Sequence, residues 1–152
     1  MPNNSVKQEL LLQDRSGQLR LNMWAETIEF LSDHPLTGAG LASYQTLIYP
    51  YRIDKWIEVF HHPHNIFLTM WVNLGLLGLI GFVWILVWFY RVGLTVAIKN
   101  KNLGLEAFLI SAMTVFIITG LVDSPYIKND MAILFWFLPA LLFLEAKKTT
   151  CT

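Results

Sequence analysis

The stretch EVFHHPHNIFLTMWVNLGLLGLIGF, residues 58–82, places three histidines directly before a long apolar run. No charged side chain occurs between residues 65 and 90, and about 20 apolar residues are enough for a helix to cross a bilayer. The run therefore predicts a transmembrane helix over residues 65–90. His61, His62 and His64 then lie where the chain enters the membrane, and a titratable side chain in such a place is a functional candidate.

The composition of the whole chain agrees with a membrane protein. Hydrophobic residues make up 55% of the 152 residues and charged residues 14%, whereas a soluble domain carries about a quarter charged residues. The formal net charge is zero, so no basic surface for nucleic acid is expected. Cys151 is the single cysteine, which excludes an internal disulfide. We expect an all-α integral membrane protein.

Two further apolar segments predict transmembrane helices over residues 104–122 and 131–146. The connection after the first span and the C-terminal tail, residues 147–152, are rich in positive charge: Arg91, Lys99, Lys101, Lys147 and Lys148. The connection between the second and third spans holds only Lys128, beside Asp123 and Asp130. By the positive-inside rule, the first connection and the tail are cytoplasmic. Residues 1–64 and the connection at residues 123–130 are then extracytoplasmic.

The extracytoplasmic region reads as helical rather than disordered. An amphipathic helix is predicted over about residues 18–32, and the His34-Pro35 dipeptide ends it. Its apolar face is expected to carry Trp24, Ile28 and Leu31. Gly38 and Gly40 predict a turn, and a short helix is expected over about residues 41–47.

His64 is the strongest candidate for chemistry. Pro63 suits the first position of a helix, so the first span is expected to begin there with His64 in its first turn. The positive end of the helix dipole attracts anions and disfavours a protonated imidazole. One helical stripe is expected to face other helices: His64, Leu68, Trp71, Gly75 and Gly78. His64 would then point into the bundle.

Plainer interpretations of the same residues stay open. A histidine at a membrane surface can cap a helix or bind a headgroup. Arg20 and Arg52 can be solvated or contact headgroups, and Asp123 can be a polar end to the second span. A metal site made of His61, His62 and His64 is disfavoured because their spacing is not a helical i, i+4 pair and no cysteine lies nearby.

The order of these residues resembles a known family. RLNMWAETIEFLSDHPLTGAGLASY followed by HPHNIFLTMWVNLGLLGLIGF is similar to the C-terminal part of the O-antigen ligase and O-antigen polymerase superfamily, over about residues 18–90. The matching positions are Arg20, Trp24, the His34-Pro35-Leu36 segment, Gly38, Gly40, His64, Asn65, Leu68, Gly75 and Gly78.

The resemblance implies an enzyme of the bacterial cytoplasmic membrane that transfers a glycan at its outer face, as in lipopolysaccharide biosynthesis. The donor would be a glycan on undecaprenyl diphosphate, and the acceptor a hydroxyl of a glycolipid, another glycan or a protein. No metal or cofactor is implied. Ligase, polymerase and protein oligosaccharyltransferase activities stay open. A non-catalytic membrane scaffold is the alternative from another class. A transporter fragment is disfavoured because no charged residue occurs at positions 107–122 or 131–144 of the second and third predicted spans.

The resemblance also implies roles for single residues. His64 matches the catalytic base, and Arg20 matches an arginine that binds the diphosphate. Asp123 would orient the base or the acceptor. Arg52 is kept as a further substrate-binding candidate, although the family pattern has no counterpart for it. Members of the family have more spans, so we expect this chain to be a C-terminal portion that works with an N-terminal transmembrane portion and is inactive without it.

Overall fold

The computed structural model describes residues 15–99, 104–124 and 129–150, and these residues form helices joined by turns and loops without any strand. The prediction of an all-α chain is confirmed. The elements are α2 (Arg15–Asp33), α3 (Tyr44–Leu47), the 3-10 helix η1 (Tyr49–Tyr51), α4 (Ile66–Lys99), α5 (Leu105–Gly120) and α6 (Asn129–Thr150). Lys101 and Lys128, which were predicted to lie in the connections between spans, and Cys151 of the predicted tail are outside the described residues.

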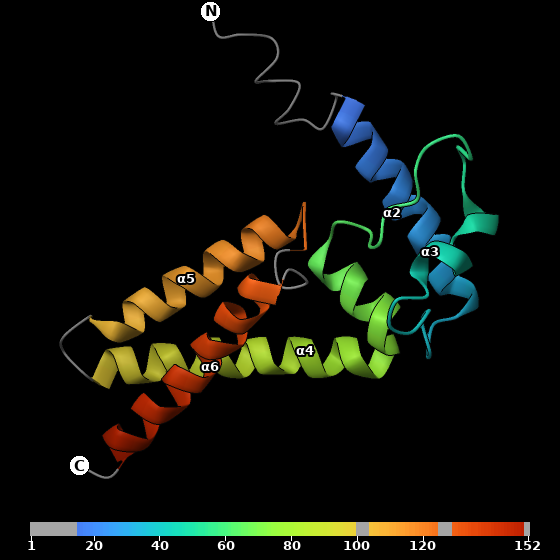
Figure 1. The fold of residues 1–152 in the computed structure, drawn as a ribbon. Coiled ribbons are helices and arrows are strands. Elements are labelled where there is room, and N and C mark those ends of the chain that lie inside the picture. Colours follow the sequence, from blue (N-terminus) through green and yellow to red (C-terminus); the bar gives the residue numbers. More distant parts are fainter. Residues whose placement is uncertain (1–14, 100–103, 125–128, 151–152) are drawn as a thin grey trace, which may run out of the picture.

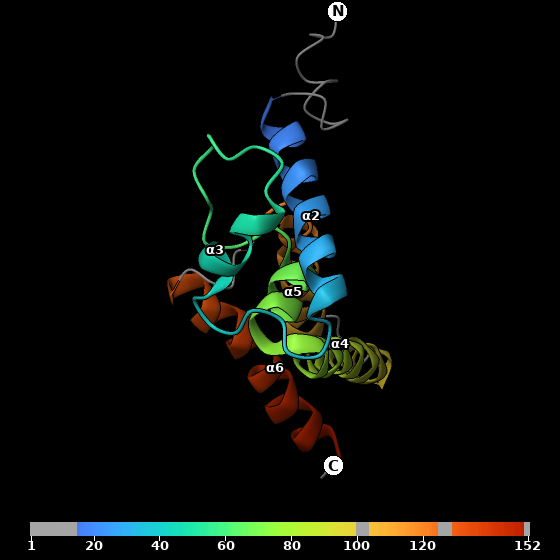
Figure 2. The same ribbon diagram turned by 90° about the vertical axis from the view of Figure 1, so that its right-hand side faces the viewer.

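The helices form two groups (Figure 1). α5 and α6 both pack against α4, which α6 crosses, and the three share one apolar core. Its buried residues are Ile66, Met70, Phe82, Leu86, Phe89, Leu109, Met113, Phe135, Leu138 and Leu142. Residues 15–65, here called the N-terminal lobe, gather at one end of α4, and Figure 2 shows α2 and α3 in front of the helices when the bundle is seen from that end.

α4 is two helical arms rather than one straight helix. Gly75 has non-helical angles, φ 70° and ψ −174°, and the chain changes direction sharply there (Figure 1). Residues 66–74 form a short arm and residues 76–99 a long arm. The predicted stripe from His64 to Gly78 is therefore wrong, because the helical repeat breaks at Gly75 and Gly78 lies beyond the break.

The loop after α2 satisfies the backbone groups that the break releases. The Ala39 and Gly40 amides donate to the Val72 carbonyl at 2.7 and 3.1 Å, and the Leu76 amide donates to the Leu36 carbonyl at 3.2 Å. Buried backbone groups need such partners. The loop is thus an integral part of α4.

Two glycines make this contact possible. Gly38 has φ 61° and Gly75 has φ 70°, and a Cβ at either position would overlap a backbone carbonyl oxygen of the opposite segment, that of Val72 or that of Leu36. Left-handed angles favour glycine as well. The predicted turn at Gly38 and Gly40 is present, since both glycines have positive φ.

A second, smaller core lies between the N-terminal lobe and the short arm of α4. It contains Phe30, Leu31, Tyr44, Ile48 and Val72. Ile28, predicted on the apolar face of α2, is 57% exposed, because α2 turns the face with Thr27 and Phe30 inward instead. Val72 lies in this core while Ile66 and Met70 lie in the bundle core, so the short arm joins the two groups.

Among the described residues, α4 is the one helix that is both long and apolar enough to cross a membrane. At about 1.5 Å per residue, its long arm alone runs about 35 Å, compared with about 30 Å for the hydrocarbon core of a bilayer. α5 is apolar but has 16 residues. α6 has 22 residues and contains Pro139.

Candidate functional site

Asn65 caps the N-terminus of α4 and thereby sets the position of His64. The Asn65 Oδ1 atom accepts hydrogen bonds from the Phe67 and Leu68 amides at 3.0 and 3.1 Å, which is the geometry of an N-terminal cap. α4 therefore begins at Ile66. The predicted start at Pro63 is wrong, and His64 lies outside the helix with φ 49°.

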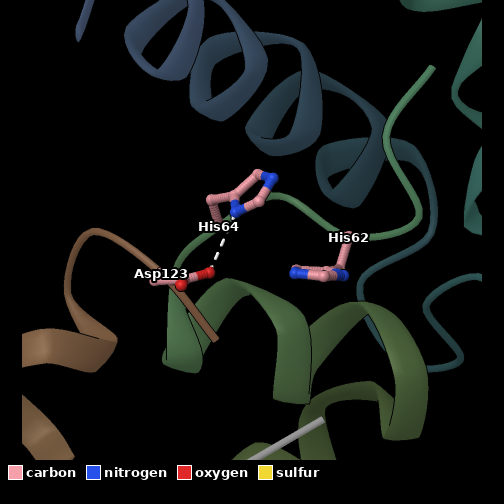
Figure 3. Close-up of side chains that lie close together, drawn as sticks. All are labelled: His62, His64 and Asp123. Atoms are coloured by element: carbon pink, nitrogen blue, oxygen red, sulfur yellow. Dashed lines mark hydrogen bonds and ion pairs between the residues drawn. The ribbon is translucent and has the colours of Figure 1, made fainter. Parts of the chain in front are cut away.

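His64 faces Asp123, which lies 59 positions later in the sequence. Its Nδ1 atom is 3.0 Å from the Asp123 Oδ1 atom, and the Ser124 amide donates to the same oxygen at 2.8 Å. The two side chains are 24% and 45% exposed. Figure 3 shows the second ring nitrogen of His64 pointing away from Asp123. One ring nitrogen is thus fixed by a carboxylate and the other is presented elsewhere.

The short arm of α4 and the end of α5 hold this pair together. The Asn65 Nδ2 atom donates to the Leu121 carbonyl at 3.0 Å. The hydroxyls of Thr69 and Ser124 lie 2.8 Å apart in a buried contact. Gly120 allows α5 to pack directly on Ile66. Sequence reasoning missed the linking roles of Asn65, Thr69 and Ser124, although an asparagine before an apolar helix is a recognisable cap signal.

α2 contributes to the site through Trp24. The Trp24 indole nitrogen donates to the Pro63 carbonyl at 2.8 Å, which ties residues 61–64 to α2. Arg20 lies one turn earlier on α2, and its guanidinium donates to the Ser16 hydroxyl at 2.8 Å. No hydrogen bond or ion pair joins Arg20 to His64 within the described part of the chain. Arg20 is near in sequence to the Trp24 contact but is not part of the His64–Asp123 pair.

Arg52 has a structural role in this conformation. Its Nε atom lies 3.5 Å from the Glu26 carboxylate, and the two side chains are only 8% and 6% exposed. One guanidinium nitrogen also donates to the Asp54 and Ile57 carbonyls at 2.8 and 3.0 Å. Glu26 in turn accepts from the Ile53 amide at 2.8 Å. These bonds fasten the loop at residues 52–57 to α2.

A small cavity borders Arg52 rather than His64. Its volume is about 30 Å³, and Glu26, Tyr44, Arg52 and Phe60 are among the residues that line it. His62, His64 and Asp123 are not among the residues that line it.

Two aromatic neighbours surround His64. The His62 and His64 rings lie 4.6 Å apart between centroids, and the Phe60 ring meets His64 edge-on at 5.2 Å. His61 is exposed. Among the described residues, His61 is not part of any cluster that could hold a metal ion, so the set of His61, His62 and His64 is not assembled. The structure brings Asp123 to His62 and His64 instead, with their potential ligand atoms all within 4.8 Å of one another (Figure 3).

Comparisons with known proteins agree with the sequence resemblance. A sequence model of the O-antigen ligase family matches residues 4–83, which includes His64 and stops before Asp123. A protein of Rickettsia conorii named "Putative polysaccharide ligase" is 30% identical over an alignment of 103 residues that covers 64% of this chain and 25% of that protein. The chain therefore spans about a quarter of the length of this curated relative. No solved structure matches the chain significantly.

Proposed function

Because the chain belongs to the O-antigen ligase family, we propose that it carries out glycan transfer in the bacterial cytoplasmic membrane. The donor is a glycan carried on undecaprenyl diphosphate, and the acceptor is a hydroxyl of a glycolipid or another glycan. The observation that carries the proposal is the 3.0 Å contact between His64 and Asp123. His64 lies inside the segment that matches the family, directly before the long apolar helix.

The contact supports His64 as a general base. The Asp123 carboxylate accepts a hydrogen bond from His64 when the Nδ1 atom carries the proton. The Nε2 atom is then unprotonated and takes the proton of the acceptor hydroxyl, because a carboxylate that holds one imidazole nitrogen fixes the tautomer and orientation of the other. Asp123 is a positioning residue in this account.

The transfer step follows from this arrangement. The acceptor oxygen attacks the anomeric carbon of the donor sugar while its proton passes to the His64 Nε2 atom. The bond between that carbon and the diphosphate breaks, and its electron pair leaves with the diphosphate. A cation at the leaving group stabilises the charge that develops there. We propose that Arg20 supplies this cation, since a guanidinium suits phosphate oxygens and Arg52 is engaged with Glu26.

The placement in the membrane completes the proposal. We propose that the long arm of α4, α5 and α6 cross the bilayer, with Arg91 and Lys99 at the inner end of the long arm. The N-terminal lobe, Asp123 and the short arm then lie at the outer surface. A lipid-borne donor can enter from the bilayer there while the acceptor arrives from water. The hydropathy of α4 and α5 supports this placement.

The experiment follows transfer of a radiolabelled glycan from undecaprenyl diphosphate in membranes that carry the native protein. His64→Ala is compared with wild type and with His61→Ala, which changes an exposed neighbouring histidine. Loss of a general base lowers such rates by about 10²–10⁴-fold, so we expect that loss for His64→Ala at normal protein level and near-normal transfer for His61→Ala. Equal transfer in all three would reject the catalytic role and favour a scaffold.

A further inference from the structure

The side chains of His62, His64 and Asp123 form a cluster that the transfer mechanism does not use in full. Their potential ligand atoms lie within 4.8 Å of one another, and Figure 3 shows the His62 ring edge directed toward the other two. The transfer step needs His64 and Asp123 alone. His62 adds a second imidazole next to the His64–Asp123 pair, and the transfer mechanism assigns it no role.

The donor set matches the preferences of one class of ion. Two imidazole nitrogens and one carboxylate oxygen are common ligands of Zn²⁺, with bond lengths of about 2.0–2.2 Å. Ligands of one tetrahedral ion therefore lie about 3.4 Å from each other. The His64 Nδ1 and Asp123 Oδ1 atoms, 3.0 Å apart, are close to this distance. A pair of ligand atoms at the upper bound of 4.8 Å needs to close by roughly 1–1.5 Å to reach it.

The surroundings of the cluster favour a fixed and accessible site. The Trp24 indole holds the Pro63 carbonyl between the two histidines at 2.8 Å. The Ser124 amide holds the Asp123 oxygen at 2.8 Å. Such contacts to the groups around the ligands orient metal sites and raise their affinity. The exposure of His64 and Asp123 at 24% and 45% gives an aqueous ion a path to them.

We propose that His62, His64 and Asp123 bind a divalent transition-metal ion of the Zn²⁺ class, and that the bound ion inhibits glycan transfer. Three protein ligands leave a fourth position for water. Metal binding requires the ring nitrogens in their unprotonated form, so the ion occupies a lone pair of His64 and displaces the contact with Asp123 that orients the base. The inhibitory part rests on the proposed role of His64, whereas the binding part does not.

The test uses Co²⁺ as a spectroscopic probe and Zn²⁺ as competitor, with the purified chain in detergent. We expect wild type and His61→Ala to develop the visible absorption of tetrahedral Co²⁺, and micromolar Zn²⁺ to abolish it. His62→Ala and Asp123→Ala should bind at least tenfold more weakly, since even the loss of an outer contact costs about 10–100-fold. Equal binding by wild type and His62→Ala, or no absorption in any protein, would overturn the site.

The second measurement is transfer with and without Zn²⁺, with each variant compared to its own metal-free rate. We expect Zn²⁺ to lower transfer at least tenfold in wild type and in His61→Ala, and to have a much smaller effect in His62→Ala. Binding without inhibition would reject the inhibitory role and leave the metal site standing. Absence of metal-free transfer in wild type would count against the proposed function, while the Co²⁺ spectra still decide the site.

Discussion

At the residue scale, Asn65 makes two structural contacts through the oxygen and the nitrogen of its side-chain amide. Its Oδ1 atom caps α4, and its Nδ2 atom holds the Leu121 carbonyl two residues before Asp123. The cap fixes where the histidine segment ends, and the second bond fixes where the aspartate segment begins. The site therefore depends on a side chain that is not itself in the proposed proton path.

Substitution of Asn65 separates these two contacts. Aspartate keeps an oxygen for the cap but has no N–H for Leu121, so Asn65→Asp should melt within a few degrees of wild type yet transfer up to about 100-fold more slowly, as misplaced catalytic groups do. Asn65→Ala should lose about 1 kcal/mol of stability as well. Thermal unfolding and transfer rates test this. Asn73→Ala on the same arm is the control, and a rate in Asn65→Asp equal to that control would refute the positioning role.

Tyr44 gives the N-terminal lobe a dependence on alkaline pH. Burial raises its pKa from 10.0 to about 12, while the hydrogen bond with Thr27 opposes the shift. Above pH 10 the unfolded chain releases this proton before the folded chain does, so the contribution is present below pH 10 and is lost as pH rises through about 12. The loss in unfolding free energy is about 2–3 kcal/mol.

Unfolding measured from pH 8 to 12 checks this expectation. Tyr44→Phe should lose about 1 kcal/mol at pH 8 with the hydrogen bond to Thr27 and should show a much weaker decline above pH 10. Tyr49→Phe, at a half-exposed tyrosine, should decline as wild type does. An undiminished decline in Tyr44→Phe would show that the pH dependence arises elsewhere.

At the element scale, the break in α4 is held by hydrogen bonds to the loop at residues 36–40, and we call this contact the joint. Gly75→Ala places a Cβ against the Leu36 carbonyl at a positive φ, and we expect a loss of at least about 2 kcal/mol of stability. Gly81→Ala lies in the long arm with open space around it and should be neutral or stabilising by about 1 kcal/mol. Thermal unfolding of both variants decides the matter, and equal stability would contradict the joint.

The sequence indicated the helices better than it indicated the joint. Hydrophobic periodicity and the lack of charge predict where helices lie, because burial of apolar side chains depends on local pattern. The break depends on hydrogen bonds between Val72 and residues 39–40, which are distant in the sequence. A glycine in an apolar helix reads as close packing, so Gly75 was placed on a stripe instead of at a break.

At the scale of the whole molecule, the single cysteine allows a clean test of sidedness. In cells with a permeabilised outer membrane, a membrane-impermeant maleimide should label Trp56→Cys in a Cys151→Ser background, since position 56 is 97% exposed in the N-terminal lobe. Cys151 of the wild type should be labelled only after the inner membrane is opened, as the positive-inside rule predicts. The reverse labelling pattern would invert the proposed orientation.

The candidate site was predicted in part. His64 and Asp123 were both singled out, His64 from its position before the apolar run and both from the family resemblance. Their direct contact could not be derived from sequence, because it depends on how α5 packs against the short arm. The burial of Arg52 could not be predicted from the sequence. An arginine in a polar loop is expected to be solvated, but Arg52 is buried against Glu26 because of how the loop at residues 52–57 folds.

The most direct test of the central claim is a double-mutant cycle in the transfer assay with His64→Ala, Asp123→Ala and the double variant. If Asp123 acts by orienting His64, removing it after His64 is gone should cost little, and the double variant should transfer at nearly the rate of His64→Ala alone. The account predicts this non-additive result. Losses that multiply in the double variant would show that the two residues act independently and would contradict the proposed pair.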